Sequence, residues 1–312
     1  MKVIVPRYSG FCPGVRSAEK RIFEERARIG SRKIWVYGSL IHNRNYISFL
    51  EGKGIVTASR IDDLPSGEVY AVRTHGVSRK EEELPREKGE VIDLTCSKEK
   101  AIQRKIAEHA ESGFFTVISG SRSHPEVMGL VSYAREHIVV ENEEGLEEFL
   151  ADDRGLMDVL SRKEGILIVS QTTGSRSLFE LISSRISGLL GSRVRIVAID
   201  TTCSVMGNRE REALKRQMEV DVTFVVGDRR SSNARGLFEA HRKTGLFYPG
   251  SRWAESIGSE RISERSGRIF LLNPFFHRGS DRGVSEEYRL RIKDLRNSED
   301  RRGKSYGGVS KR

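Results

Sequence analysis

The chain has 312 residues, enough for two or three domains that each bury their own core. Its three cysteines lie far apart and form no C-x-x-C pair, which argues against a disulfide framework and a zinc ribbon. No signal peptide or long apolar run is seen, so we expect a cytoplasmic protein without a membrane partner. The net charge of +10 is concentrated in residues 251–312, where 12 Arg and 3 Lys face 9 acidic residues, so we do not expect nucleic acid as a partner.

The first element to note is the stretch GFCPGV, residues 10–15. A short strand over Val3–Val5 is predicted to end before it, and a helix to begin after Cys12. A helix N-terminus stabilises negative charge and so favours the thiolate form of this cysteine. An ordinary cysteine in a turn is the alternative.

The same order of elements occurs three times along the chain. A cysteine at a strand end is followed by a helix, a second strand, a glycine and a polar cluster. The cysteine and the glycine are 24 residues apart for Cys96 and Cys203, and 26 apart for Cys12. The three polar clusters are His42-Asn43, His124-Pro125-Glu126 and Ser231-Ser232-Asn233. A repeat of this kind predicts three similar units.

Two further polar loops follow later strands, Thr74-His75 in the first unit and Gln171-Thr172-Thr173 in the second. Strands that alternate with helices predict small α/β units with mainly parallel sheets, whose functional groups gather at the carboxyl ends of the strands. The predicted units are 13–95, 96–195, and 1–12 with 196–250, followed by a basic tail over 251–312. Three histidines in helix-like stretches are assigned no role: His109, His137 and His241.

Three convergent thiolates could hold zinc or an iron–sulfur cluster. Three ligands on a cubane of four irons leave one iron open to substrate. The surrounding imidazoles, hydroxyls and amide suit a phosphorylated anion, and Glu126 beside His124 could donate a proton. Two alternatives stay open here: a zinc hydrolase, and a non-catalytic redox-sensing or structural metal protein that acts on RNA through its basic tail.

Taken together, the motifs GFCPGV, IHN, THGV, D-x-TC, HPEV-x-G, QTT and SSN resemble those of the 4-hydroxy-3-methylbut-2-enyl diphosphate reductase family, the LytB-type enzymes. The resemblance spans about four fifths of the chain. It implies a trilobed fold around a [4Fe-4S] cluster held by Cys12, Cys96 and Cys203. It also implies reductive removal of the substrate 4-hydroxyl, with ferredoxin or flavodoxin as electron donor, giving isopentenyl and dimethylallyl diphosphate.

The resemblance also assigns roles to residues of the polar loops. Glu126 would deliver protons with His124 nearby, and Thr172 would lie near the substrate hydroxyl. The diphosphate would be surrounded by His42, His75, His124, Ser231, Ser232 and Asn233.

The resemblance stops after about residue 245. Where the family has a loop that helps to bind the diphosphate, this chain reads NPFFHRGSDRG, with Ser280 in the corresponding place. One interpretation is a divergent or disordered extension. The other is a reading-frame slip, because codons permitted for residues 277–282 include the family loop one base later. A slip predicts that the third unit lacks its final strand and that the chain is a weak or inactive enzyme.

Overall fold

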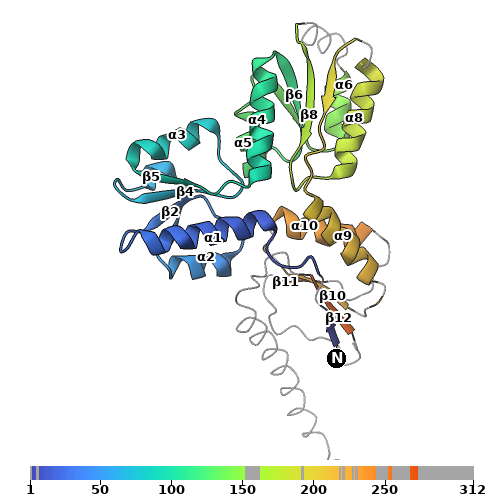
Figure 1. The fold of residues 1–312 in the computed structure, drawn as a ribbon. Coiled ribbons are helices and arrows are strands. Elements are labelled where there is room, and N and C mark those ends of the chain that lie inside the picture. Colours follow the sequence, from blue (N-terminus) through green and yellow to red (C-terminus); the bar gives the residue numbers. More distant parts are fainter. Residues whose placement is uncertain are drawn as a thin grey trace, which may run out of the picture.

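The computed structural model describes residues 2–4, 7–151, 162–190, 193–217, 222–226, 231–243, 252–254 and 268–272, with the single positions 219 and 228. Three lobes surround a common junction, each built on a parallel four-stranded sheet (Figure 1). The predicted trilobed α/β fold with parallel sheets is therefore confirmed.

The first lobe holds the sheet β3-β2-β4-β5. Its strands are β2 (Ile34–Tyr37), β3 (Ile55–Ala58), β4 (Val69–Val72) and β5 (Glu90–Asp93), and its helices are α1 (Pro13–Arg28), α2 (Arg44–Glu51), the 3-10 turn η1 (Ile61–Asp63) and α3 (Arg79–Lys88). Helix α1 begins with Pro13, whose fixed φ suits a first helical position, and ends with Arg26 and Arg28 in its last turn. Its buried Ala18 and Ile22 pack into the core that covers β2 and β4.

The second lobe holds the sheet β7-β6-β8-β9. Its strands are β6 (Phe114–Ser119), β7 (His137–Val140), β8 (Gly165–Ser170) and β9 (Ile196–Ala198), and its helices are α4 (Ser97–Glu111), α5 (Pro125–Val131), α6 (Glu143–Ala151) and α8 (Arg176–Leu190). Both central strands are buried along their whole length. Alternate residues of β8 enter opposite cores, Ile166 and Ile168 one, Leu167 and Val169 the other, as expected for a parallel sheet covered on both faces.

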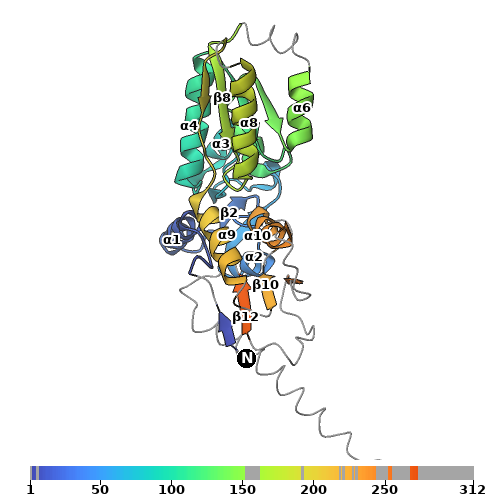
Figure 2. The same cartoon turned by 90° about the vertical axis from the view of Figure 1, so that its right-hand side faces the viewer.

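The third lobe holds the sheet β1-β12-β10-β11. Its strands are β1 (Lys2–Ile4), β10 (Val222–Val226), β11 (Arg252–Ala254) and β12 (Arg268–Leu272), and its helices are α9 (Ser204–Gln217) and α10 (Ser232–Lys243). The first strand of the chain lies beside β12 in both views (Figures 1 and 2). The expectation that this unit lacks its final strand is therefore wrong, because Arg268–Leu272 pairs with both β1 and β10.

The sheets differ from the predicted divisions of the chain at two places. Strand β9 pairs with β8, so the second sheet reaches Ala198 and passes the predicted boundary at 195. Strands β11 and β12 bring parts of the predicted tail into the third sheet. His137 begins strand β7, whereas a helix was predicted there. The apolar run IFLL is short and contains a single β-branched residue, so it does not stand out among the surrounding Arg, Ser and Gly.

All three sheets share one strand order. The first strand of each unit lies between its second and third strands, and the fourth follows the third at the edge. In the third lobe that fourth position is taken by β1, from the other end of the chain. The predicted threefold repeat thus becomes a ring in which each fourth strand leads into the cysteine and helix that open the next lobe.

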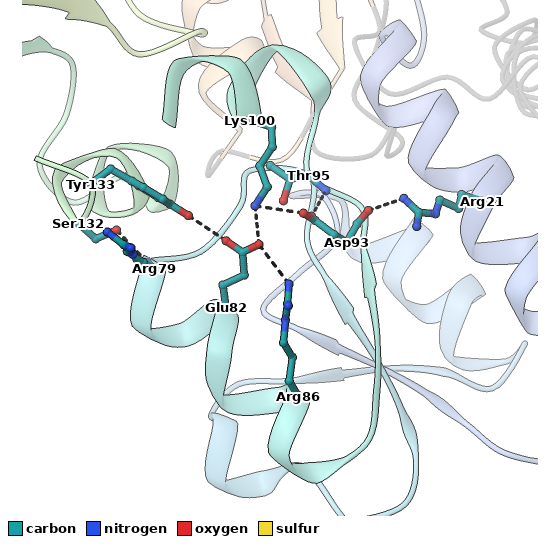
Figure 3. A network of polar contacts seen from close by, with 9 residues as sticks. All are labelled: Arg21, Arg79, Glu82, Arg86, Asp93, Thr95, Lys100, Ser132 and Tyr133. Carbon is teal, nitrogen blue, oxygen red and sulfur yellow. Dashed lines mark hydrogen bonds and ion pairs between the residues drawn. The ribbon is translucent and has the colours of Figure 1, made fainter. Parts of the chain in front are cut away.

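Polar contacts join the first lobe to α4 of the second (Figure 3). The Lys100 Nζ lies 2.6 Å from a Glu82 carboxylate oxygen and 3.1 Å from Asp93. The hydroxyl of Tyr133 donates to the other Glu82 oxygen at 2.9 Å. These half-buried groups fix α3 and β5 against α4, which begins directly after Cys96.

No helix among the described residues has the length and apolar character that a membrane crossing requires.

Candidate active site

Each cysteine lies between a fourth strand and the helix that follows it. Cys12 caps α1, and its Sγ accepts from the Val15 amide at 3.4 Å. Cys96 is the residue before α4, and Cys203 the residue before α9. The amides of Cys96 and Cys203 donate to the carbonyls of Thr74 and Thr172 at 3.0 and 2.7 Å. Thus two of the cysteines are bonded directly to the predicted polar loops.

The three thiols face one another across the junction of the lobes. They are free and half-buried, and a Cβ added to Gly14 would lie 2.8 Å from the Cys96 Sγ and 3.8 Å from the Cys12 Sγ. Burial raises the pKa of the Cys96 thiol, and the Cys12 and Cys203 thiols raise it further, while amides at the start of α4 lower it. Within the described part of the chain, no three His, Cys, Asp or Glu side chains meet at a single metal-ion position.

The Cβ position of Gly14 lies close to the thiols of Cys96 and Cys12. Replacing this glycine therefore tests how tightly the cysteine segments pack, and the test needs no cofactor. In Gly14→Ala the new methyl group would lie 2.8 Å from the Cys96 Sγ, so the residues around it must shift to accept it. We expect unfolding free energy to fall by about 1–3 kcal/mol, as for other overpacked sites. Gly188→Ala in α8 is the matched control: nothing lies within 4 Å of its added Cβ, so it should gain roughly 0.5–1 kcal/mol. If Gly14→Ala and Gly188→Ala changed the unfolding free energy equally in denaturant titrations, tight packing around Gly14 would be contradicted.

Three of the predicted histidines come together beside the cysteines. His42 stacks on His75 with ring centroids 5.9 Å apart, and His75 meets His124 edge-on at 5.6 Å. His42 precedes α2, His75 follows β4, and His124 caps α5. Burial, then the neighbouring histidines and Arg73, lower the pKa of His75 to about 3. Burial, then His42, Arg235 and Arg73, lower that of His124 to about 4.

This cluster is suited to an anion. Without a ligand the imidazoles of His75 and His124 are neutral at pH 7, because both burial and nearby cations oppose a further positive charge. A bound phosphate would reverse that balance, since its charge favours the protonated rings and pairs with the guanidinium groups.

Glu126 lies in the first turn of α5, and its amide donates to the His124 Nδ1. It is 1 % exposed and accepts from Thr172 twice, from the amide to Oε1 and from the hydroxyl to Oε2 at 2.9 Å. Burial raises the pKa of Glu126, while the two bonds from Thr172 lower it. The carboxyl is therefore held in one orientation. Because its pKa is raised, it keeps its proton to a higher pH than an exposed glutamate does.

Glu99 of α4, also buried at 2 % exposure, stands beside Glu126. Burial raises the pKa of Glu99 well above its usual range, and the Glu126 charge raises it further. Two carboxylates in a shared buried site do not both ionise readily, so the pair keeps a proton to a higher pH than an exposed carboxyl does. This places a store of protons next to the residue predicted to deliver them.

The third lobe adds its own polar cluster. Ser231 is buried, and its hydroxyl accepts from the Ala234 amide at 3.3 Å at the start of α10. Ser232 and Asn233 are half-buried in the first turn, and Arg235 of the same helix acts on the pKa of His124. Residues of all three lobes therefore lie in or near the histidine cluster. Ser280 and the rest of the loop over 273–283, on which the reading-frame interpretation also depends, lie outside the described residues.

Sequence reasoning missed several charged groups in and around this site: Arg73, Glu99, Arg209 and Arg235. Glu99 stands in SKEK, which reads as an exposed helix start. Only its burial against α5 marks it as special, and burial of a single charged residue leaves no local pattern in the sequence.

The fold and the site define a class: a trilobed α/β protein in which one cysteine from each lobe junction borders a shared polar pocket. The family model described as LytB protein matches residues 3–248. The chain belongs to this family, which confirms the predicted resemblance.

Curated relatives carry one common name. The chain is 32% identical over 241 residues to 4-hydroxy-3-methylbut-2-enyl diphosphate reductase of Aquifex aeolicus (strain VF5), covering 76% of this chain and 78% of that protein. It is 35% identical over 243 residues to the protein of the same name from Alkaliphilus oremlandii (strain OhILAs), covering 77% and 81%.

Solved structures give the same result. A structure titled (E)-4-hydroxy-3-methyl-but-2-enyl diphosphate reductase, the terminal enzyme of the non-mevalonate pathway, matches with a TM-score of 0.65 and 28% identity over 94% of this chain and all of that one. The E-1-hydroxy-2-methyl-but-2-enyl-4-diphosphate reductase of Plasmodium falciparum has a TM-score of 0.75 at 22% identity, over 91% of this chain and 87% of that one, and so supports the fold.

Proposed function

We propose that this chain is a 4-hydroxy-3-methylbut-2-enyl diphosphate reductase of the non-mevalonate isoprenoid pathway. In this reaction the allylic alcohol takes up two electrons and two protons, its C–O bond breaks, and water leaves. The products are isopentenyl and dimethylallyl diphosphate, which differ in the position of their double bond.

The observation that carries the proposal is the position of Glu126. Its carboxyl is buried, follows His124 by two residues and accepts from the Thr172 hydroxyl, while the Thr172 carbonyl accepts from the backbone amide of Cys203. Thr172 therefore joins the acid to the segment that carries one of the three thiols. A reductive dehydroxylation needs a proton donor and an electron source side by side.

The three cysteines fit an iron–sulfur cluster by their chemistry. Thiolates are the usual ligands of such clusters, and Cys12, Cys96 and Cys203 each lie directly before a helix, whose N-terminal amides interact favourably with negative charge. The absent side chain of Gly14 keeps the space between Cys12 and Cys96 open. When bound, a [4Fe-4S] cluster supplies the electrons and one iron without a protein ligand, which acts as a Lewis acid.

The protein's own residues perform the remaining work. Thr172 holds Glu126 in place and presents its hydroxyl to the substrate oxygen, and Glu126 donates the proton that leaves with that oxygen as water. Glu99 can then restore the proton to Glu126. The histidines and the Ser231–Asn233 turn bind the diphosphate, and burial of the pocket excludes bulk water. Ferredoxin or flavodoxin as electron donor, and a cytoplasmic location, stay predictions.

His42→Ala should weaken substrate binding and change the chemical step little. Loss of one hydrogen bond to a charged group costs about 1.5–3 kcal/mol, so KM should rise by about tenfold or more. His109→Ala is the control, because His109 lies on α4 and contacts Phe114 and Lys105 rather than the pocket. A fall in kcat at unchanged KM would contradict the binding role.

The binding of the diphosphate should also depend on pH. The pKa values of about 3 for His75 and about 4 for His124 rise when an anion enters, so binding takes up protons. Affinity should therefore increase as the pH falls below neutral, a trend that calorimetry on the His42→Ala variant should show in weaker form.

The proposed activity is tested directly with anaerobically purified and reconstituted protein. A brown protein with broad visible absorption, an absorption change on adding the diphosphate substrate, and formation of both products with a chemical reductant would support the proposal. A colourless zinc protein, or a brown one that ignores the substrate, would contradict it.

A further inference from the structure

The three helices that follow the cysteines share a second feature. Each carries a basic side chain that donates to a backbone carbonyl shortly before the next cysteine in the ring. The pairs are Arg21 with Asp93 at 2.8 Å, Lys98 with Thr202 at 2.8 Å, and Arg209 with Tyr8 at 2.8 Å and with Gly10. Figure 3 shows the first of them, with Arg21 reaching from α1 to Asp93.

The acceptor carbonyls all lie a few residues before a cysteine, and this position determines what the contacts can do. Asp93 precedes Cys96, Thr202 precedes Cys203, and Gly10 precedes Cys12. Every cysteine segment is therefore bonded to the helix that begins at the previous cysteine. The ring fixes the segments relative to one another across the lobes.

Arg209 differs from the other two because it is buried. Its residue is 3 % exposed, whereas Arg21 is exposed and Lys98 half-buried. Two of its nitrogens donate to carbonyls, and its Nη1 is buried without a hydrogen-bond partner. A buried charge normally has a paired opposite charge, since the cost of its dehydration is otherwise large.

The opposite charges that act on Arg209 are two of the thiols. Burial lowers the pKa of the guanidinium and Arg16 also lowers it, while Cys12 and Cys203 raise it. Arginine stays protonated under all ordinary conditions, so the cation is permanent. The guanidinium therefore lies near enough to Cys12 and Cys203 for both to act on it, and one of its nitrogens is buried without a hydrogen-bond partner.

We propose that Arg209 is a positioning residue with two roles: it fixes the Cys12 segment against α9, and its charge balances the anionic thiolate cluster. The inference rests on the proposed function, because the second role needs the cluster. A fixed cation beside the cluster stabilises the form that carries one more electron, and so makes reduction easier.

The test is a redox titration of the reconstituted protein, followed by its visible and paramagnetic resonance spectra. In Arg209→Gln the reduction equilibrium should become less favourable by about tenfold, which for one electron is a potential about 59 mV lower. Arg209→Lys keeps the charge and loses the forked geometry, so its potential should stay near that of the wild type while iron is lost faster to a chelator. Arg211→Gln, an exposed change of the same charge on the same helix, should alter neither.

Each result decides the matter. A wild-type potential and wild-type iron retention in Arg209→Gln would overturn the inference. If Arg209→Gln does not fold, by circular dichroism of the metal-free protein, Arg209→Lys decides: iron retention equal to that of Arg211→Gln would overturn the positioning role. A wild-type protein that takes up no cluster would contradict the proposed function itself, a result distinct from either of these.

Discussion

Replacing any one of Cys12, Cys96 or Cys203 by serine is expected to leave the protein with little bound iron after anaerobic reconstitution. The chain contains only these three cysteines, one at each lobe junction, so none can take over from another. Two thiolates would leave two of the four irons without a protein ligand, and a cluster so exposed is lost. Iron and sulfide content per chain is the measurement.

Two comparisons separate ligand loss from misfolding. The metal-free Cys→Ser proteins should unfold close to the metal-free wild type, because serine nearly preserves the size of each half-buried side chain. Ser97→Ala, one position after Cys96 and exposed, should bind iron normally. Full iron content in any one of the three cysteine variants would remove that residue from the site.

Glu126→Gln is expected to lower turnover by about 10²-fold or more while substrate still binds. Glutamine keeps the shape of the side chain and can still accept one of the two bonds from Thr172, yet it has no acidic proton to give. Single-turnover product formation measures the chemical step, and the absorption change on adding substrate measures binding.

The pH profile tests the same residue. Since burial raises the pKa of both Glu126 and Glu99, the pair stays protonated to a higher pH than an exposed carboxyl. Wild-type turnover should fall as the pH rises through that raised pKa, and this fall should be absent from the residual activity of Glu126→Gln. Glu148→Gln on the exposed face of α6 serves as control. Normal turnover in Glu126→Gln would mean that another group supplies the proton.

Much of this architecture could be predicted from the repeat alone. Equal spacing from Cys96 to Gly120 and from Cys203 to Gly227 reflects one helix and one strand in each unit, and all three sheets share one strand order. Polar residues after the strands were predicted to meet, and His42, His75 and His124 do meet. Local rules suffice here because parallel strands put their carboxyl ends at one edge.

What could not be predicted depends on contacts between distant segments. Strand β12 is weak by local pattern and is stabilised by β1 and β10 on either side. Glu99 and Arg209 look like surface residues of charged helices, and only the packing of one lobe against the next buries them. The division of the chain into units stays a prediction apart from the three sheets themselves.

The pairing of β1 with β12 has a consequence for how this protein is made. Lys2 pairs with Arg268, so β1 is synthesised long before β12 and cannot pair until β12 has followed. Long-range pairing of this kind is slow. Until it forms, the unpaired strand exposes backbone groups that can pair with other chains and lead to aggregation. Cys12 follows that strand directly, and its segment can be fixed only after α9 and Arg209 have emerged. The first and second lobes can therefore fold during translation, whereas the junction that holds the three cysteines is completed only after α9 and β12 have been synthesised.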